Sequence, residues 1–159
     1  MSKTLKFLNT RDAKEVLNIV KEQWGADLIS EGFLDKFALM QDSNNNIFII
    51  SKGVSALNSV KHLRIDSAGL YFGELKNGNL RLSIEGSQIV GRHASKNIVK
   101  LSREECSEWM KGNSIRKDIP SHQGYLIVKY ENYFLGCGRI KDGMLLNFIP
   151  KVRRVSEPW

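Results

Sequence analysis

The chain has 159 residues, of which 42% are hydrophobic and 26% charged, and its formal net charge is +7. This composition can bury a hydrophobic core and suits one compact domain or two small ones that share an interface. The longest apolar runs, such as residues 47–50, are far too short to cross a bilayer, and two cysteines are too few for a disulfide framework. We therefore expect a soluble, cytoplasmic protein whose first residues are not a signal peptide.

The first predicted element is an amphipathic helix over residues 10–24. Apolar side chains recur there at spacings of three and four, while lysine and glutamate fill the opposite face. Thr10 is the expected N-cap, Asp12 lies in the expected first turn, and Gly25 is the expected end of the helix. Further along, a short helix is expected over residues 86–93.

Two strand pairs are predicted between these helices. Residues 37–40 and 47–51 are apolar runs on either side of an asparagine-rich turn, whose residues tolerate left-handed backbone geometry. Residues 69–75 and 80–84 flank an Asn-Gly dipeptide, which is the strongest short-range signal for a hairpin.

The second half of the chain predicts one strand, one capped helix and three closely connected strands. Ser102 and Glu105 have the spacing of a capping box, and Gly112 is the expected end of that helix. The strands are expected over residues 98–101, 125–130, 133–141 and 144–149. This order of elements predicts a small, partly closed β-barrel that carries a helix.

The predicted fold class is therefore α+β, with a small N-terminal α/β domain over residues 1–94. This domain is expected to pack on a C-terminal β-barrel domain with a helix, over residues 95–159. Cys106 and Cys137 lie among apolar neighbours, so we expect reduced cysteines in the core.

Motifs for catalysis or cofactor binding are not found in the sequence. It contains no phosphate-binding Gly-x-x-x-x-Gly-Lys loop and no Gly-x-Ser-x-Gly nucleophile elbow. The histidines lie far apart, without cysteines or carboxylates at metal-ligand spacing, at His62, His93 and His122. The carboxylates Glu104, Glu105 and Glu108 are most simply a capped, solvated helix face. We expect no catalytic residue, no metal, no cofactor and no enzymatic activity.

The positive charge is concentrated in the second half of the chain. Residues 1–80 contain 10 lysines and arginines against 9 carboxylates, whereas residues 81–159 contain 14 against 8. Such an excess favours a polyanionic partner. Charge alone leaves open the alternative that these residues only keep the protein soluble.

The candidate RNA-binding residues are the basic side chains of the second half and two glycines. They are Lys151, Arg153, Arg154, Arg139, Lys141, Arg116, Lys117, Gly136 and Gly138. Alternation along a strand places Arg139 and Lys141 on one face. The cluster at residues 151–154 follows the last predicted strand, so its cations are expected to be exposed, with Val152 pointing inward between them.

Two further expectations concern glycines and aromatic residues. Gly136 and Gly138 are expected at a bulge or a close backbone approach in the curved barrel, where they would also admit an RNA backbone. The tyrosines and phenylalanine of the last strands are interpreted as core side chains rather than as a platform for stacking bases. They are Tyr125, Tyr130, Tyr133 and Phe134.

Three segments of the second half, residues 124–130, 135–141 and 146–154, resemble PUA domains, an RNA-binding module. The similarity is greatest to the PUA-like C-terminal region of RsmF-type ribosomal RNA 5-methylcytosine methyltransferases. Those proteins typically end in Asn-x-x-Pro-Lys-x-x-Arg, which is matched here by Asn147, Pro150, Lys151 and Arg154. The layout of a small α/β domain before a PUA domain also resembles the pre-PUA and PUA ribosome-biogenesis factors.

The resemblance implies a protein that docks on structured ribosomal or transfer RNA during ribosome biogenesis or RNA modification. Catalysis is not implied, because the methyltransferases use a Pro-Cys nucleophile and a cofactor site. Here the prolines precede Ser121, Lys151 and Trp159. Two alternatives remain: an adaptor that binds a separate RNA-modifying enzyme or assembly factor through its N-terminal domain, and a small RNA-acting enzyme.

Overall fold

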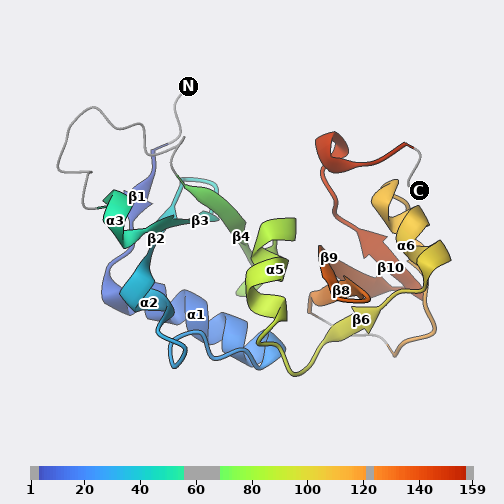
Figure 1. The fold of residues 1–159 in the computed structure, drawn as a ribbon, viewed down its shortest axis with the longest axis horizontal. Coiled ribbons are helices and arrows are strands. Elements are labelled where there is room, and N and C mark those ends of the chain that lie inside the picture. The colour runs from blue at the N-terminus through green and yellow to red at the C-terminus, as the bar shows by residue number, and fades with distance from the viewer. Residues whose placement is uncertain (1–3, 56–68, 121–123, 157–159) are drawn as a thin grey trace.

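The computed structural model describes residues 4–55, 69–120 and 124–156, and these residues form an α+β structure. Their strands make two five-stranded sheets, one from each half of the chain. The sheets stand side by side with helix α5 between them, while α1 runs along the first sheet and α6 covers the second (Figure 1).

The first sheet is an antiparallel meander in the order β1-β2-β3-β4-β5. Its strands are β1 (Lys6–Phe7), β2 (Phe37–Gln41), β3 (Asn46–Ser51), β4 (Leu70–Lys76) and β5 (Asn79–Leu82). Both predicted hairpins form. At the second, Asn77 and Gly78 have positive φ angles of 53° and 78°, the geometry that the Asn-Gly dipeptide favours.

Helix α1 (Thr10–Trp24) forms as predicted, but its N-cap is Asn9 rather than Thr10. Asn9 has extended backbone geometry, and its side-chain oxygen accepts a hydrogen bond from the Asp12 N–H at 2.8 Å. Gly25 ends the helix at a φ of 73°. Two four-residue helices that the sequence did not predict, α2 (Phe33–Lys36) and α3 (Lys52–Ser55), flank the β2–β3 hairpin.

The second sheet is curled, with the strand order β6-β8-β9-β10-β7. Its strands are β6 (Ile98–Lys100), β7 (Ile115–Arg116), β8 (Leu126–Tyr130), β9 (Tyr133–Lys141) and β10 (Met144–Asn147). Helix α6 (Arg103–Met110) begins with the predicted capping box between Ser102 and Glu105. Strand β6 pairs in parallel with β8, and β7 pairs with β10 at the other edge; neither pairing was predicted.

Helix α5 (Ile84–Gly91) begins two residues earlier than expected. The preceding strand ends at Leu82, and Ser83 is the N-cap, accepting a hydrogen bond from the Gly86 N–H at 2.9 Å. The expected strand over residues 80–84 is therefore too long by two residues. The sequence pattern hid this boundary because Ile84 is apolar and continues the strand alternation.

The two halves of the chain share one hydrophobic core. Trp24, on α1, is fully buried, and its indole N–H donates to the Tyr125 carbonyl at 3.1 Å. Tyr125, Ile127 and Cys137 from the second half belong to the same buried cluster as the apolar residues of α1 and the first sheet. The second cluster lies between α6 and the other face of the second sheet, around Trp109.

We predict that Trp24→Phe lowers the free energy of unfolding by about 1–3 kcal/mol, because the buried Tyr125 carbonyl loses its donor. Urea titration followed by circular dichroism measures this change. Lys14→Ala, an exposed change on the same helix, serves as the control and should alter stability by about 0.5 kcal/mol or less. If Trp24→Phe unfolds at the same urea concentration as the parent, this hydrogen bond does not stabilise the fold as predicted.

Candidate nucleic-acid interface

Three of the predicted cations meet on one face of the second sheet. In the strand register, Met144 of β10 lies opposite Arg116 of β7 on one side and Lys141 of β9 on the other. Arg139 lies opposite Leu146. Directly opposed residues project from the same face of a sheet, so these five residues form one surface, which we call the cationic face.

The cations of the cationic face are open to solvent. Arg116, Arg139 and Lys141 are all exposed, whereas Ile140 between the last two is buried on the opposite face. The prediction that Arg139 and Lys141 share a face is thus confirmed. The salt bridges formed within the described segments use none of these three cations, so their charge is not cancelled by a carboxylate in direct contact.

Lys117 is adjacent to Arg116 but differs from it in its contacts. Its ammonium group forms a 2.9 Å salt bridge with Glu105 of α6, and both side chains are mostly covered. Burial acts to raise the pKa of the Glu105 carboxyl, but the hydrogen bonds from Ser102 and Lys117 outweigh burial, so the pKa is lowered. Lys117 therefore anchors the loop after α6, and its charge is largely neutralised.

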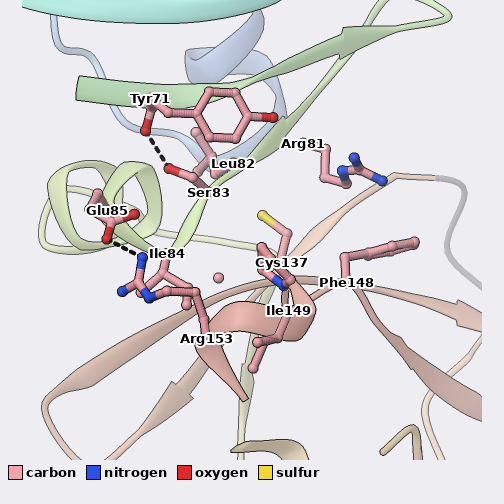
Figure 2. A pocket seen from close by; sticks show the side chains of 12 residues that line it. Tyr71, Arg81, Leu82, Ser83, Ile84, Glu85, Cys137, Phe148, Ile149 and Arg153 are labelled. Carbon is pink, nitrogen blue, oxygen red and sulfur yellow. Dashed lines mark hydrogen bonds and ion pairs between the residues drawn. The ribbon is translucent and has the colours of Figure 1, made fainter. Parts of the chain in front are cut away.

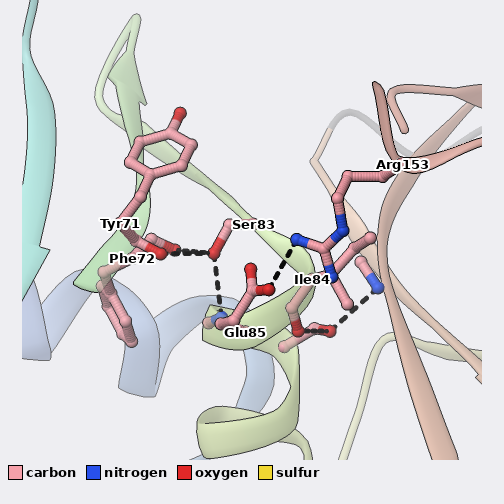
Figure 3. A network of polar contacts seen from close by, with 9 residues as sticks. Tyr71, Phe72, Ser83, Ile84, Glu85 and Arg153 are labelled. Atoms are coloured by element: carbon pink, nitrogen blue, oxygen red, sulfur yellow. Dashed lines mark hydrogen bonds and ion pairs between the residues drawn. The ribbon is translucent and has the colours of Figure 1, made fainter. Parts of the chain in front are cut away.

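The C-terminal cations lie on a separate turn, η2 (Lys151–Arg153), and at the residue directly after it, and two of them bind other parts of the protein. Arg153 forms a 2.6 Å ion pair with Glu85 in the first turn of α5 (Figure 3). Arg154 donates to the Ile149 carbonyl at 3.1 Å, and its side chain covers Gly112. Lys151 is exposed. The turn thus connects α5 with the end of α6 and is separate from the cationic face on β7, β10 and β9.

The prediction for Val152 was wrong. Its side chain is 91% exposed instead of pointing inward. The alternation that predicted burial ends with β10, and residues 151–153 form a 3₁₀ turn in which all side chains face solvent. The expected exposure of the neighbouring cations is confirmed.

Gly136 and Gly138 lie in the interior of the protein. Gly136 has a φ of 89° and lies where the β8–β9 register shifts, as expected for a bulge. A Cβ atom on Gly138 would lie 2.6 Å from Leu145 Cδ1 and 3.0 Å from Trp109 Cη2. Because both glycines are buried, they do not lie where an RNA backbone could approach, and we exclude them from the interface.

Asn147, part of the resemblance noted above, also has a structural role. Its amide group donates to the carbonyls of Trp109 and Asn113 at 2.7 and 3.0 Å, and its side-chain oxygen accepts from the Ile149 N–H at 2.8 Å. Asn147 therefore fixes the end of α6 to β10. The sequence motif marks a position that shapes the fold rather than a surface contact.

A cavity of about 120 Å³ lies where the two halves meet (Figure 2). Arg81 lies over the Phe148 ring, 5.0 Å from its centroid, and forms a 2.9 Å salt bridge with Glu74. Cys137 lines the cavity, and burial raises the pKa of its thiol to about 12. The thiol stays protonated at neutral pH, so it is a poor nucleophile.

The described residues offer no cluster of three histidine, cysteine, aspartate or glutamate side chains that could hold a metal ion. Of the three histidines considered in the sequence, His93 is exposed, while His62 and His122 lie outside the described residues. Within the described segments, every helix is too short or too polar to span a membrane.

Comparison with known families relates the second half of the chain to one known domain family. Residues 96–155 match the family described as the methyltransferase RsmF PUA domain. This segment contains the whole second sheet, α6 and the turn at residues 151–153. The second half is therefore a PUA-like region related to that of RsmF, as the sequence motifs indicated.

Similar proteins include ribosomal RNA small subunit methyltransferase F from several bacteria. The Aeromonas hydrophila protein is 30% identical over 89 residues, which cover 56% of this chain and 19% of that protein. The Vibrio cholerae protein is 21% identical over 108 residues, covering 68% and 22%. The Vibrio atlanticus protein is 24% identical over 128 residues, covering 77% and 27%. This chain thus spans about a fifth to a quarter of these relatives, and the alignments are longer than the matched PUA segment.

The lowered pKa of Glu105 predicts a pH dependence of stability. A carboxyl whose pKa is lower in the folded state than its usual 4.5 stabilises the fold above that value and loses this contribution as the pH falls below it. In Lys117→Met, the pKa of Glu105 is lowered less. The unfolding midpoint of the parent should therefore fall more steeply below about pH 5 than that of the variant.

Urea titrations at several pH values test this prediction. Arg103→Met removes an exposed cation from the same helix without removing a partner of Glu105, so it should follow the parental pH profile. Identical profiles for the parent and Lys117→Met would show that the ion pair does not control the carboxyl.

Proposed function

We propose that this protein binds structured ribosomal or transfer RNA through the cationic face of its PUA-like half, and that it has no catalytic activity. The observation that carries the proposal is the alignment of Arg116, Arg139 and Lys141 across three neighbouring strands. Fixed cations at such spacing neutralise phosphates and release counterions when a nucleic acid binds. The match of residues 96–155 to an RsmF PUA domain supports this assignment.

The composition of the cationic face suits recognition of shape rather than of base sequence. Its cations surround the half-buried, apolar side chains of Met144 and Leu146. Cations would contact phosphates, and the apolar patch would lie against sugars, as expected for recognition of an A-form RNA surface. Lys151 would extend this contact from the C-terminal turn.

The kind of domain that the family model matches supports the assignment of a role without catalysis. The relatives are named as ribosomal RNA methyltransferases, and this chain corresponds to about a fifth to a quarter of each. The segment matched by the family model is a PUA domain rather than a catalytic domain. We therefore infer that the chain contributes RNA docking in ribosome biogenesis or RNA modification, in the cytoplasm.

The balance of charge in the first half, 10 lysines and arginines against 9 carboxylates in residues 1–80, favours a second candidate function, that of an adaptor. In this candidate function, a separate RNA-modifying enzyme or assembly factor would supply the chemistry. The first half of the chain, whose charges nearly balance, would provide the surface for that protein.

We predict that the combined variant Arg116→Gln, Arg139→Gln and Lys141→Gln binds an RNA hairpin more weakly, with an unchanged melting temperature. Each lost phosphate contact should reduce the slope of log K against log salt by about 0.7, so the slope should fall by about 2. The stability should be preserved because all three side chains are exposed. Fluorescence anisotropy at several salt concentrations measures both the affinity and the slope.

The matched control replaces three exposed cations of the first half, Lys6, Arg11 and Lys14, with glutamine. It lowers the net charge by the same amount, so any effect of overall charge appears in both variants. Equal losses of affinity and slope in the two variants would place RNA binding outside the cationic face.

The absence of catalysis is tested separately. After incubation of the protein with RNA, with and without a methyl donor, mass spectrometry of the digested nucleosides should show no new modification. A modified nucleoside that depends on the protein would identify a small RNA-acting enzyme. If modification appears only when a second protein is added, the adaptor function is favoured.

A further inference from the structure

A pocket of about 280 Å³ lies between the short helix α2 and the end of α5. Its floor is apolar: Leu28 and Phe33 are buried, and Phe37 and Ile89 are half-buried. All four belong to the core that the two halves share or pack against it, so the pocket opens onto that core. Its volume lies just below the range of about 300–1,000 Å³ found for small-ligand pockets, which suits a single apolar side chain.

The rim of this pocket is charged. Lys36 of α2 and Arg92 and His93 at the end of α5 line it, and Glu31 is the one carboxylate among its lining residues. Asp35, the neighbour of Lys36, does not line the pocket. All four lining side chains are exposed, and the salt bridges formed within the described segments include none of them. The rim therefore favours a ligand that carries negative charge.

A larger groove on the PUA-like half lacks such charges. It measures about 380 Å³, lies between α5, α6 and the β8–β9 hairpin, and is lined by uncharged side chains. Tyr133, which lines it, is 63% exposed, whereas Tyr125 is only 7% exposed. The interpretation of the aromatic residues as core side chains is thus confirmed for Tyr125 and wrong for Tyr133. Because no charged side chain lines this groove, its charge does not identify an occupant, whereas that of the pocket beside α2 does.

We infer that the pocket beside α2 binds an acidic segment of a separate protein, which places one apolar side chain against Phe37 and Ile89. Carboxylates of that segment lie beside Lys36 and Arg92. The inference rests on the adaptor function proposed above and specifies its surface and the chemistry of the partner; the cationic face takes no part in it. An apolar anchor in a pocket provides most of the binding energy of many interfaces, and opposite charges at the rim provide specificity.

Glu31 favours a peptide over a nucleic acid as the occupant. A nucleic acid carries a continuous row of phosphates, which the Glu31 carboxylate would repel. A peptide also has backbone N–H groups, which can donate to that carboxylate while acidic side chains bind Lys36 and Arg92. The apolar side chains of the floor have no polar group that could hydrogen-bond the edge of a base.

The experiment measures the binding of fluorescein-labelled peptides of seven residues to the full chain by fluorescence anisotropy. The central residue is leucine, phenylalanine or glycine, and the three residues on each side are all glutamate, all glutamine or all lysine. The parent is compared with the double variant Lys36→Gln and Arg92→Gln. The matched control, Lys6→Gln and Lys14→Gln, removes the same charge outside the pocket. All four side chains are exposed, so both variants should keep the parental melting temperature.

The parent should bind most tightly the peptides that have glutamate flanks and an apolar centre. The double variant should lose about tenfold in affinity for these peptides, as expected for two exposed ionic contacts. It should also lose most of the salt dependence of binding, while the control behaves like the parent. A glycine centre should weaken binding to the parent because the apolar anchor is lost. In ¹H–¹⁵N spectra, the bound peptide should shift the amide signals of residues 28–37 and 89–93.

Three results would overturn the inference: no binding of any glutamate-flanked peptide, an unchanged affinity in the double variant, and amide shifts confined to other residues. If the double variant loses affinity for an RNA hairpin but not for the peptides, the pocket binds nucleic acid instead. If it loses only self-association in sedimentation, the occupant is a second copy of the chain. A parent that binds the hairpin but no peptide refutes this inference alone, and one that binds peptide but no RNA refutes the proposed RNA binding alone.

Discussion

The position of strand β9, and with it that of Arg139 and Lys141 on the cationic face, depends on a buried hydrogen bond between Ser87 of α5 and Gly136. Ser87 is fully buried on α5; its hydroxyl accepts from the Gly136 N–H at 2.8 Å and donates to the Ile84 carbonyl at 2.6 Å. At Gly136 the strand carries an extra residue, so Phe134 and Cys137, three residues apart, both belong to the core shared with the first half. Without the serine, the Gly136 N–H would be buried without a partner, which costs about 1–3 kcal/mol.

The parts of the fold that the sequence predicts are those set by neighbouring residues. Asn77 and Gly78 fix a hairpin, and Ser102 and Glu105 fix a helix start, because turn and cap geometry depend on only a few residues. Pairing between distant segments is not predictable in this way. The two-residue strand β7 has no periodic pattern of its own, yet its pairing with β10 brings Arg116 to the cationic face.

Ion pairs at the candidate site are also contacts between distant segments, so the sequence does not predict which cations are neutralised. The sequence identifies each cation but not the carboxylate beside it, so Lys117 and Arg153 were grouped with Arg139 although Glu105 and Glu85 neutralise them. These pairs are partly exposed, and such pairs contribute only about 0–1 kcal/mol to stability. A phosphate that offers a better partner can displace the carboxylate from Arg153 at little cost. In the proposed function, the cluster on the C-terminal turn would therefore be a secondary contact, and the cationic face, whose cations form no salt bridge within the described residues, would be the primary one.

In the proposed function, the cationic face binds RNA by neutralising phosphates, and this contact weakens as salt rises. Its cations lie on two strands, Arg116 on β7 and the pair Arg139 and Lys141 on β9, with β10 hydrogen-bonded between them. The sheet therefore fixes the spacing of these cations before RNA binds, so binding needs little ordering of the backbone. Because phosphates carry no base sequence, such a fixed array would select an RNA by the shape of its backbone rather than by its bases.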